Sequence, residues 1–332
     1  MKDLLTAHLA SLKLGEATTH AGLGVFPVLA PEAAGSTAPG YALLDAALND
    51  GLVSVAEVSE GGHVPELRLE NRAPLPLLLI EGEELVGAKQ NRVLNTSLLV
   101  AAKSTVTIPV SCVEAGRWRY ASADFQSEGR MLHSSGRARK VSDVSASVRA
   151  RSEYRSDQGA VWDAVAAQAH RLRVNSPTQA YSDVVQARHD DLGAFRAAFR
   201  ALPGQTGVLV TLGGHVLGLD LFAAPDTLAA LLPKLAQSYA LDAVEAEAPP
   251  IEPGKALDQS RGFLDAVGAT TMTAHPSVSL GEAVRLSSPR VAGAALVHEA
   301  RVLHLCAFPG HGVDEPFSGR MARASRRRGA ML

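Results

Sequence analysis

The sequence predicts an α+β fold, with an N-terminal antiparallel β-meander or sandwich-like unit followed by a unit of helices packed on an antiparallel sheet. Three observations support this class. Between residues 50 and 115, short segments alternate apolar and polar residues, as half-buried strands do. Segments after residue 157 repeat apolar residues at the 3.6-residue period of a helix. Two hairpin-like segments, 207–223 and 293–309, add antiparallel strands to the second half.

The N-terminal unit, residues 1–115, begins with two expected helices, at Asp3–Leu14 and Tyr41–Leu48. The second ends at "NDG", where Gly51 suits a left-handed cap. The run "LPLLLI" at 75–80 is apolar on both faces, which predicts a central strand. The expected strands of the meander are residues 52–60, 64–72, 75–80, 92–100 and 104–114.

The next segment, residues 116–157, differs in composition. It holds nine Arg or Lys residues, which outnumber its acids, together with many Ser, Gly and Ala residues. No apolar period is visible in it. The sequence therefore predicts a basic, flexible connector between two units.

The C-terminal unit, residues 158–310, combines helices and strands. Helices are expected over 157–174, from Ser176 as an N-cap, over 225–243 and near 257–267. Gly213 and Gly214 predict a two-residue hairpin turn. His298 and His304 alternate with apolar residues, which predicts solvent-side strand positions. The tail at 311–332 is polar and basic, and we expect it to be disordered.

Composition limits the classes of function. The chain of 332 residues carries a formal charge of −2, which argues against nucleic acid as a partner. No apolar run approaches 18 residues, so no membrane span is expected. Cys112 and Cys306 each lie in an apolar strand pattern, which favours free buried thiols and a reducing cytoplasm. Whether the two cysteines lie close together stays open.

The block from Leu69 to Trp118, with "SPTQAY", "GLDLF" and "QSYALDAV" further on, resembles the ARG and rhodanese-phosphatase-superfamily-associated protein domain family. The resemblance covers roughly residues 20–245, and "EGEELVGAKQNRVLNTS" at 81–97 is its longest motif. The family is named for the genes it accompanies, which encode ADP-ribosylglycohydrolases and rhodanese-like phosphatases. The resemblance implies an association with ADP-ribose or phosphoester metabolism, and it implies no catalytic residue.

The motif places acids, amides and basic side chains between two apolar strands. If the strand from Arg92 runs back beside 75–80 and the strand ending at Glu114 runs back beside that, then Glu114, Asn91 and Arg92 meet. Glu81 and Glu83 are expected at the same edge. The predicted ligand-binding residues are Glu81, Glu83, Glu84, Lys89, Gln90, Asn91, Arg92, Asn95, Glu114, Arg117 and Trp118. The alternative is a polar loop whose ion pairs and amide bonds only hold the turn in shape.

The first expectation for function is a soluble, cytoplasmic accessory or sensor protein. It would bind a small phosphate-bearing ligand, ADP-ribose or nucleotide-like, at the 81–95 loop. One alternative is a metal-assisted hydrolase on an ADP-ribose or phosphoester substrate, with the glutamates holding a divalent cation such as Mg²⁺. Another is a scaffold for protein or nucleic acid. Binding is preferred to catalysis because the sequence holds no nucleophile–base motif. Whether the protein forms a homo-oligomer stays open. The sequence holds no zinc-binding motif.

Overall fold

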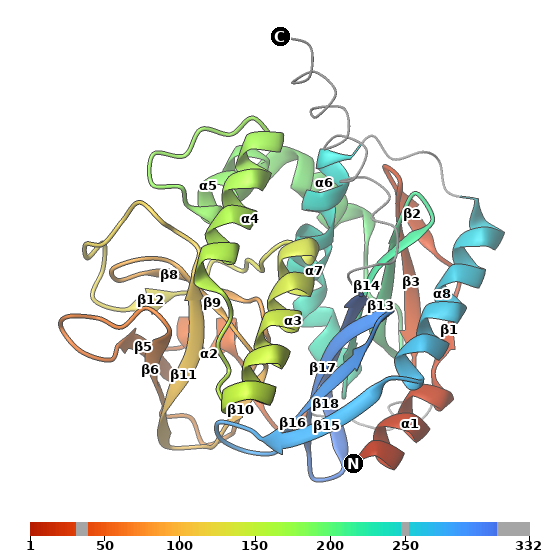
Figure 1. The fold of residues 1–332 in the computed structure, drawn as a ribbon, viewed down its shortest axis with the longest axis horizontal. Coiled ribbons are helices and arrows are strands. Elements are labelled where there is room, and N and C mark those ends of the chain that lie inside the picture. The colour runs from red at the N-terminus through yellow and green to blue at the C-terminus, as the bar shows by residue number, and fades with distance from the viewer. Residues whose placement is uncertain (31–38, 247–251, 311–332) are drawn as a thin grey trace.

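The computed structural model describes residues 1–30, 39–246 and 252–310, and it is an α+β fold (Figure 1). The predicted tail at 311–332 lies outside the described residues. No helix in the described ranges has both the length and the apolar character of a membrane span. The helices are α1 (Lys2–Ser11), α2 (Leu44–Asn49), α3 (Ser134–Arg151), α4 (Gln158–Arg171), α5 (Tyr181–Ala187), α6 (His189–Ala198), α7 (Pro225–Glu245) and α8 (Pro253–Gly268).

The largest sheet has nine antiparallel strands, in the order β1-β3-β13-β14-β18-β17-β16-β15, with β2 also paired to β3. Both predicted hairpins lie side by side in it, and the turn at Gly213 and Gly214 has φ of 56° and 85°, which suits a two-residue hairpin. Its strands are β1 (Lys13–Leu14), β2 (Thr18–His20), β3 (Leu23–Leu29), β13 (Gln205–Leu212), β14 (His215–Phe222), β15 (Thr271–Pro276), β16 (Glu282–Ser288), β17 (Val291–His298) and β18 (Arg301–Pro309).

The first three strands belong to this large sheet, although the sequence places them in an N-terminal unit at 1–115. Leu23 to Leu29 pair with β13, so the two ends of the chain share one sheet. Alternation along β13 explains the sheet's two buried faces: Leu209 packs with α1 and α8, whereas Val208 and Val210 pack with α7. Helices α3 and α7 and two smaller sheets cover this second face.

The smaller sheets replace the single predicted meander. One has the order β12-β8-β9-β11-β6-β5 and the other the order β10-β7-β4, in which β7 is central as predicted. The expected strand 92–100 divides in two, because β9 pairs with β8 and β11 whereas β10 pairs with β7. Their strands are β4 (Ala42–Leu43), β5 (Val53–Glu57), β6 (Glu66–Asn71), β7 (Leu77–Leu79), β8 (Glu84–Gly87), β9 (Arg92–Leu94), β10 (Leu98–Val100), β11 (Ser104–Cys112) and β12 (Phe125–Gln126).

Helix α3 lies within the segment expected to be a flexible connector, so that expectation is wrong for 134–151. The helix has a buried stripe of the usual spacing, but half of that stripe is polar and includes Arg137 and Lys140. Because charged residues occupy part of the buried stripe, the sequence shows no apolar helical period there. The side chains of Ser135 and Ser134 donate to Asp242 of α7, which supplies acceptors at the first turn of α3.

Candidate functional site

The predicted site residues lie mostly in the interior. Between Glu81 and Ser97, only Val86 and Lys89 are partly exposed, and every other residue is buried. The structure divides the predicted set into separate clusters with different partners. Each cluster must therefore be judged by the contacts its members make.

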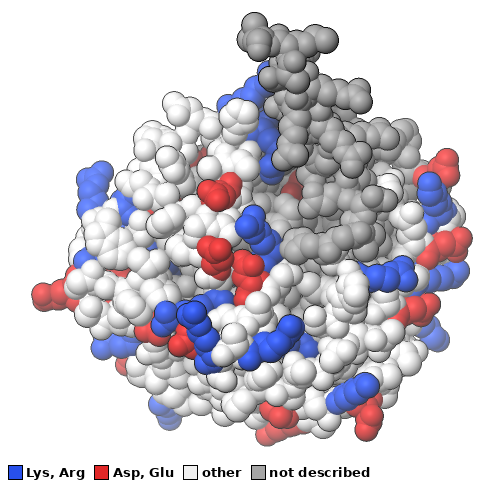
Figure 2. Space-filling view, in the orientation of Figure 1, with Lys and Arg blue, Asp and Glu red and all other residues white. Residues whose placement is uncertain are grey.

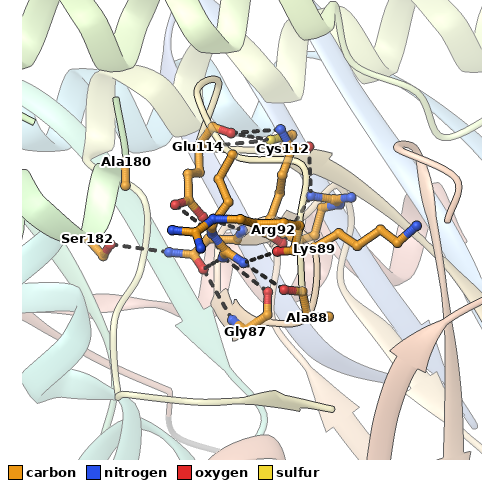
Figure 3. Close-up of polar contacts among 12 residues, drawn as sticks. Gly87, Ala88, Lys89, Arg92, Cys112, Glu114, Ala180 and Ser182 are labelled. Atoms are coloured by element: carbon orange, nitrogen blue, oxygen red, sulfur yellow. Dashed lines mark hydrogen bonds and ion pairs between the residues drawn. The ribbon is translucent and has the colours of Figure 1, made fainter. Parts of the chain in front are cut away.

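The first cluster surrounds Glu114 and agrees with the predicted strand pairing (Figure 3). Cys112 of β11 pairs with Arg92 of β9, which brings Glu114 beside the turn before Arg92. The Glu114 carboxylate accepts from the Asn91 backbone at 3.0 Å and from Arg117 Nη2 at 2.6 Å. Gln90 Nε2 donates to the Glu114 carbonyl at 2.9 Å. Burial alone would raise the pKa of the Glu114 carboxyl, but the bonds from Arg117 and the Asn91 backbone lower it overall.

The same cluster fixes the backbone between β8 and β9. Arg117 Nη1 and Nη2 donate to the carbonyls of Ala88 and Gly87, at 2.6 and 3.2 Å. Gly87 and Ala88 have positive φ angles, 129° and 38°, which side-chain bonds of this kind stabilise. Asn91 Nδ2 donates to Ser182 Oγ at 3.2 Å and ties the turn to α5 (Figure 3). These contacts match the alternative of a loop held in shape by its own polar groups.

Arg92, Lys89 and Trp118 form the outer part of this cluster. Arg92 is completely buried, donates from Nη1 to the Gln90 carbonyl at 3.0 Å and lies 3.7 Å from Glu57. Lys89 Nζ donates to the Gly61 carbonyl at 2.9 Å and lies 5.4 Å from the centre of the Trp118 ring. Trp118 is 47% exposed. Of the predicted set, Trp118 is thus the residue most accessible to a partner.

Glu81, Glu83 and Glu84 do not join Glu114, which corrects the prediction of a single edge. The Gly82 amide donates to the Leu94 carbonyl and the Leu94 amide donates to the Glu83 carbonyl, so Glu81 and Glu83 lie at the opposite end of β9 from Arg92. Glu84 pairs with Val93 in the middle of β9. The reason is the division of segment 92–100 between two sheets. Glu83 binds Lys234 of α7 at 2.8 Å and accepts from the Ile80 amide at 2.7 Å.

Glu84 is the least satisfied acid of the motif. It is fully buried, and neither carboxyl oxygen has a hydrogen-bond partner among the described residues. Arg130 lies 3.7 Å away and binds Glu128 more closely. Burial raises the pKa of Glu84 to about 8, against a smaller lowering by Arg130.

Glu81 belongs to a buried polar network between α3 and the large sheet. Arg137 of α3 donates to Glu81 at 2.7 Å and to both oxygens of Asp220, at 2.6 and 3.1 Å. Lys140 also lies near Glu81, at 3.5 Å. Burial alone would raise the pKa of Asp220, but Arg137 lowers it well below its usual range. The network holds α3 against the sheet.

His304 lies in this network, so the expected solvent-side position is wrong. It is 1% exposed and stacks on Phe222, with ring centroids 5.0 Å apart. Its Nδ1 lies 2.7 Å from Ser97 Oγ and its Nε2 lies 3.3 Å from Asp220. The order Ser97–His304–Asp220 resembles a catalytic triad. However, Arg137 occupies both Asp220 oxygens, and the three residues are buried, so the contacts are those of an internal network.

The acids of the motif do not fit a divalent cation. Glu81 and Glu83 direct their oxygens at Arg137, Lys140 and Lys234, which take the place that a metal ion would need. In the described ranges, no group of three or more His, Cys, Asp or Glu residues is arranged to hold a metal ion. Cys112 and Cys306 are free and buried, as predicted.

A cavity of about 270 Å³ lies on the face of the large sheet that α3 covers, between α3, the edge strand β15 and its neighbour β16. Thr273 pairs with Arg285 across these strands, and Thr271 pairs with Ser287, so their side chains share one face. A second cavity near α4 has about 10 Å³, the space of one water molecule. The large cavity is lined by Ser145, Arg149, Thr271, Thr273, His275, Arg285 and Ser287.

Arg285 is the unusual member of this lining. It is 3% exposed, and its Nη2 donates to Thr96 Oγ1 at 2.9 Å. Its Nε and Nη1 have no hydrogen-bond partner among the described residues, and no acid lines the cavity there. The guanidinium lies 5.2 Å from the centre of the Tyr154 ring. Burial lowers the pKa of Arg285, and the opposing effects of Tyr154, Cys306 and Glu81 are smaller.

The motif and the cavity are connected through the three residues that follow Leu94. Asn95 Nδ2 donates to the Tyr154 carbonyl at 3.0 Å, Thr96 accepts from Arg285, and Ser97 bonds to His304. The sequence did not indicate Arg285, since alternation in "EAVRLSS" is typical of a solvent-facing arginine. Only the position of α3 over the sheet encloses it.

Family comparison agrees with the motif. A model of the ARG and Rhodanese-Phosphatase-superfamily-associated Protein domain matches residues 11–308. Neither the curated proteins nor the solved structures contain a match to this chain. The chain belongs to this family, and the match extends well beyond the region in which the sequence motifs are found.

Proposed function

We propose that this family member is an accessory or sensor protein that binds a small phosphate-bearing ligand in the cavity beside Arg285. One observation carries the proposal: the buried Arg285 guanidinium has two nitrogens, Nε and Nη1, without an acceptor in the described part of the chain. A buried charge without a partner is unfavourable by several kcal/mol. A phosphate would supply both a negative charge and the missing acceptors.

The surroundings of Arg285 suit an oxyanion. Arg149 and His275 line the same cavity and add donors of positive or neutral character. On the face that Figure 2 shows, Lys and Arg side chains are interspersed with Asp and Glu rather than gathered into one large area. On this face the charge that favours an anion is thus local, which suits a small ligand better than a polyanion.

The ligand lies in the cavity beside Arg285 and not at the 81–95 loop, where the sequence led us to expect it. Residues of the loop already bind one another, as Glu114 and Arg117 do. The loop would contribute indirectly, since Thr96 holds Arg285 and Asn95 holds the Tyr154 segment. Binding stays preferred to hydrolysis because Glu81 and Glu83 are engaged with cationic side chains.

The test is a calorimetric and thermal-melt titration of the full chain with inorganic phosphate. Wild type should bind phosphate and melt at a higher temperature as phosphate rises, by about 2.7 kcal/mol of added stability at a hundred times the dissociation constant. Arg285→Met should remove binding. Arg290→Met is the matched control, because Arg290 is exposed at the turn after β16, and it should bind like wild type. No binding by wild type, or equal binding by Arg285→Met, contradicts the proposal.

A further inference from the structure

The lining of the Arg285 cavity restricts the rest of the ligand. All seven lining residues are polar, none is Phe, Tyr, Trp or aliphatic, and His275 carries the one aromatic ring among them. A nucleobase binds by stacking on an aromatic or other flat surface. Tyr154 is the nearby ring, but the Arg285 guanidinium already lies over it and its hydroxyl donates to the Pro276 carbonyl at 2.7 Å. Among the lining residues, the flat groups left for stacking are the His275 imidazole and the arginine guanidiniums, and these are the donors that the phosphate needs.

The hydroxyl groups of the cavity are available to a ligand. Thr271, Thr273 and Ser287 make no side-chain hydrogen bond within the described residues, whereas Ser145 donates to the Val141 carbonyl at 2.7 Å. Thr273 lies opposite Arg285, and Thr271 lies opposite Ser287. Each hydroxyl offers one donor and two acceptor lone pairs. Such a surface matches a carbon skeleton that carries several hydroxyl groups.

The size of the cavity agrees with a ligand larger than one oxyanion. Its volume of about 270 Å³ is near the lower end of small-molecule sites, which span roughly 300–1,000 Å³. Arg149 and Ser145 lie one helical turn apart on α3, so the charged and the hydroxyl-bearing parts of the wall face the same space.

Resting on the proposed function, we infer that the ligand is a phosphorylated sugar or polyol. Its phosphate lies between Arg285 and Arg149, and its hydroxyl groups bind Thr273, Thr271 and Ser287. A base attached to such a ligand stays outside the cavity and adds no affinity.

The experiment compares inorganic phosphate, ribose 5-phosphate, ribose, AMP and ADP-ribose by calorimetry on the full chain. Ribose 5-phosphate should bind at least about tenfold more tightly than inorganic phosphate, as one or two added hydrogen bonds provide. AMP and ADP-ribose should bind no more tightly than ribose 5-phosphate. Ribose alone should not bind measurably, because it lacks the charge that Arg285 requires.

Two variants separate the hydroxyl contacts from the phosphate contacts. Thr273→Val and Ser287→Ala should weaken ribose 5-phosphate several-fold and leave inorganic phosphate unchanged. Thr105→Val makes the same chemical change at an exposed position of β11 and should alter neither.

The outcomes distinguish this inference from the proposed function. If no phosphate compound binds, or if Arg285→Met binds phosphate as tightly as wild type does, both the proposed function and this inference are wrong. If phosphate binds through Arg285 but ribose 5-phosphate gains nothing over it, only the sugar assignment fails. Binding of AMP or ADP-ribose more than tenfold tighter than ribose 5-phosphate would likewise overturn it in favour of a nucleotide.

Discussion

Two arginines on one face of the large sheet have opposite surroundings. Arg137 binds Asp220, and Arg285 lies in the same cross-strand row as Asp220, with Cys306 and Ala294 between them. Both guanidinium groups are buried. Arg137 has two carboxylate partners, whereas the described residues around Arg285 provide one hydroxyl and no carboxylate.

The difference separates a charge that stabilises the fold from a charge that is available to a ligand. Removing one member of a buried ion pair leaves the other member without compensation. Removing a buried charge that has no ionic partner leaves no second charge without compensation. Mutations at the two arginines should therefore change the free energy of unfolding by very different amounts.

Arg137→Met should have the largest effect. It leaves Glu81 and Asp220 without their shared cation, and we expect the free energy of unfolding to fall by about 3–5 kcal/mol. Urea denaturation measures the change. Arg139→Met is the control, because Arg139 is exposed on the same helix, and it should change stability by less than about 0.5 kcal/mol. A loss below about 1 kcal/mol for Arg137→Met would show that the network does not hold α3 in place.

Glu84→Gln extends the comparison to a buried acid without a hydrogen-bonded cation. The pKa of Glu84 is raised to about 8, so the folded state retains its proton above the unfolded pKa, and wild-type stability falls as pH rises from about 4.5 to 8. The variant lacks this loss and should be more stable than wild type at pH 8 by a few kcal/mol, at about 1.4 kcal/mol per pH unit. Urea denaturation of both proteins from pH 5 to 8 measures the difference in free energy of unfolding. If that difference does not change with pH, the prediction is wrong, and a cation must stabilise the ionised Glu84 carboxylate in the folded state.

Arg285→Met should have the smallest effect on stability. It removes one hydrogen bond to Thr96, worth about 1 kcal/mol, and also removes a desolvated charge. Without phosphate, its free energy of unfolding should lie within about 1 kcal/mol of wild type in the same urea experiment. A loss as large as that of Arg137→Met would mean that Arg285 supports the fold.

The sequence identified the motif at 81–97 and placed Glu114 beside Asn91, because strand alternation and antiparallel pairing decide both. It misplaced Glu81 and Glu83, because the turn at Asn95 and Thr96 sends one expected strand into two sheets. That turn is held by tertiary bonds to Tyr154 and Arg285. Such bonds have no local signature in the chain.

The cavity could not be predicted from the sequence for a related reason. Helix α3 buries Arg137 and Lys140, so its pattern looks exposed and suggested a connector rather than a helix. If that helix is not predicted, the alternation of the strand around Arg285 is that of an ordinary strand with a surface arginine. Periodicity assumes that buried positions are apolar, and this chain departs from that rule where charges meet between α3 and the sheet.

The pairing of β3 with β13 has a consequence for synthesis of the protein. Leu23 to Leu29 find their partner only after residue 212 has been made, and at about 5–20 residues per second the nascent chain waits for roughly ten seconds or more. During this time an apolar strand has no native neighbour on that side. Pro27 lies in its middle, but its carbonyl accepts from the Gly15 amide, so the missing amide proton of Pro27 faces β1. The edge that waits for β13 therefore keeps the backbone donors with which another strand could pair.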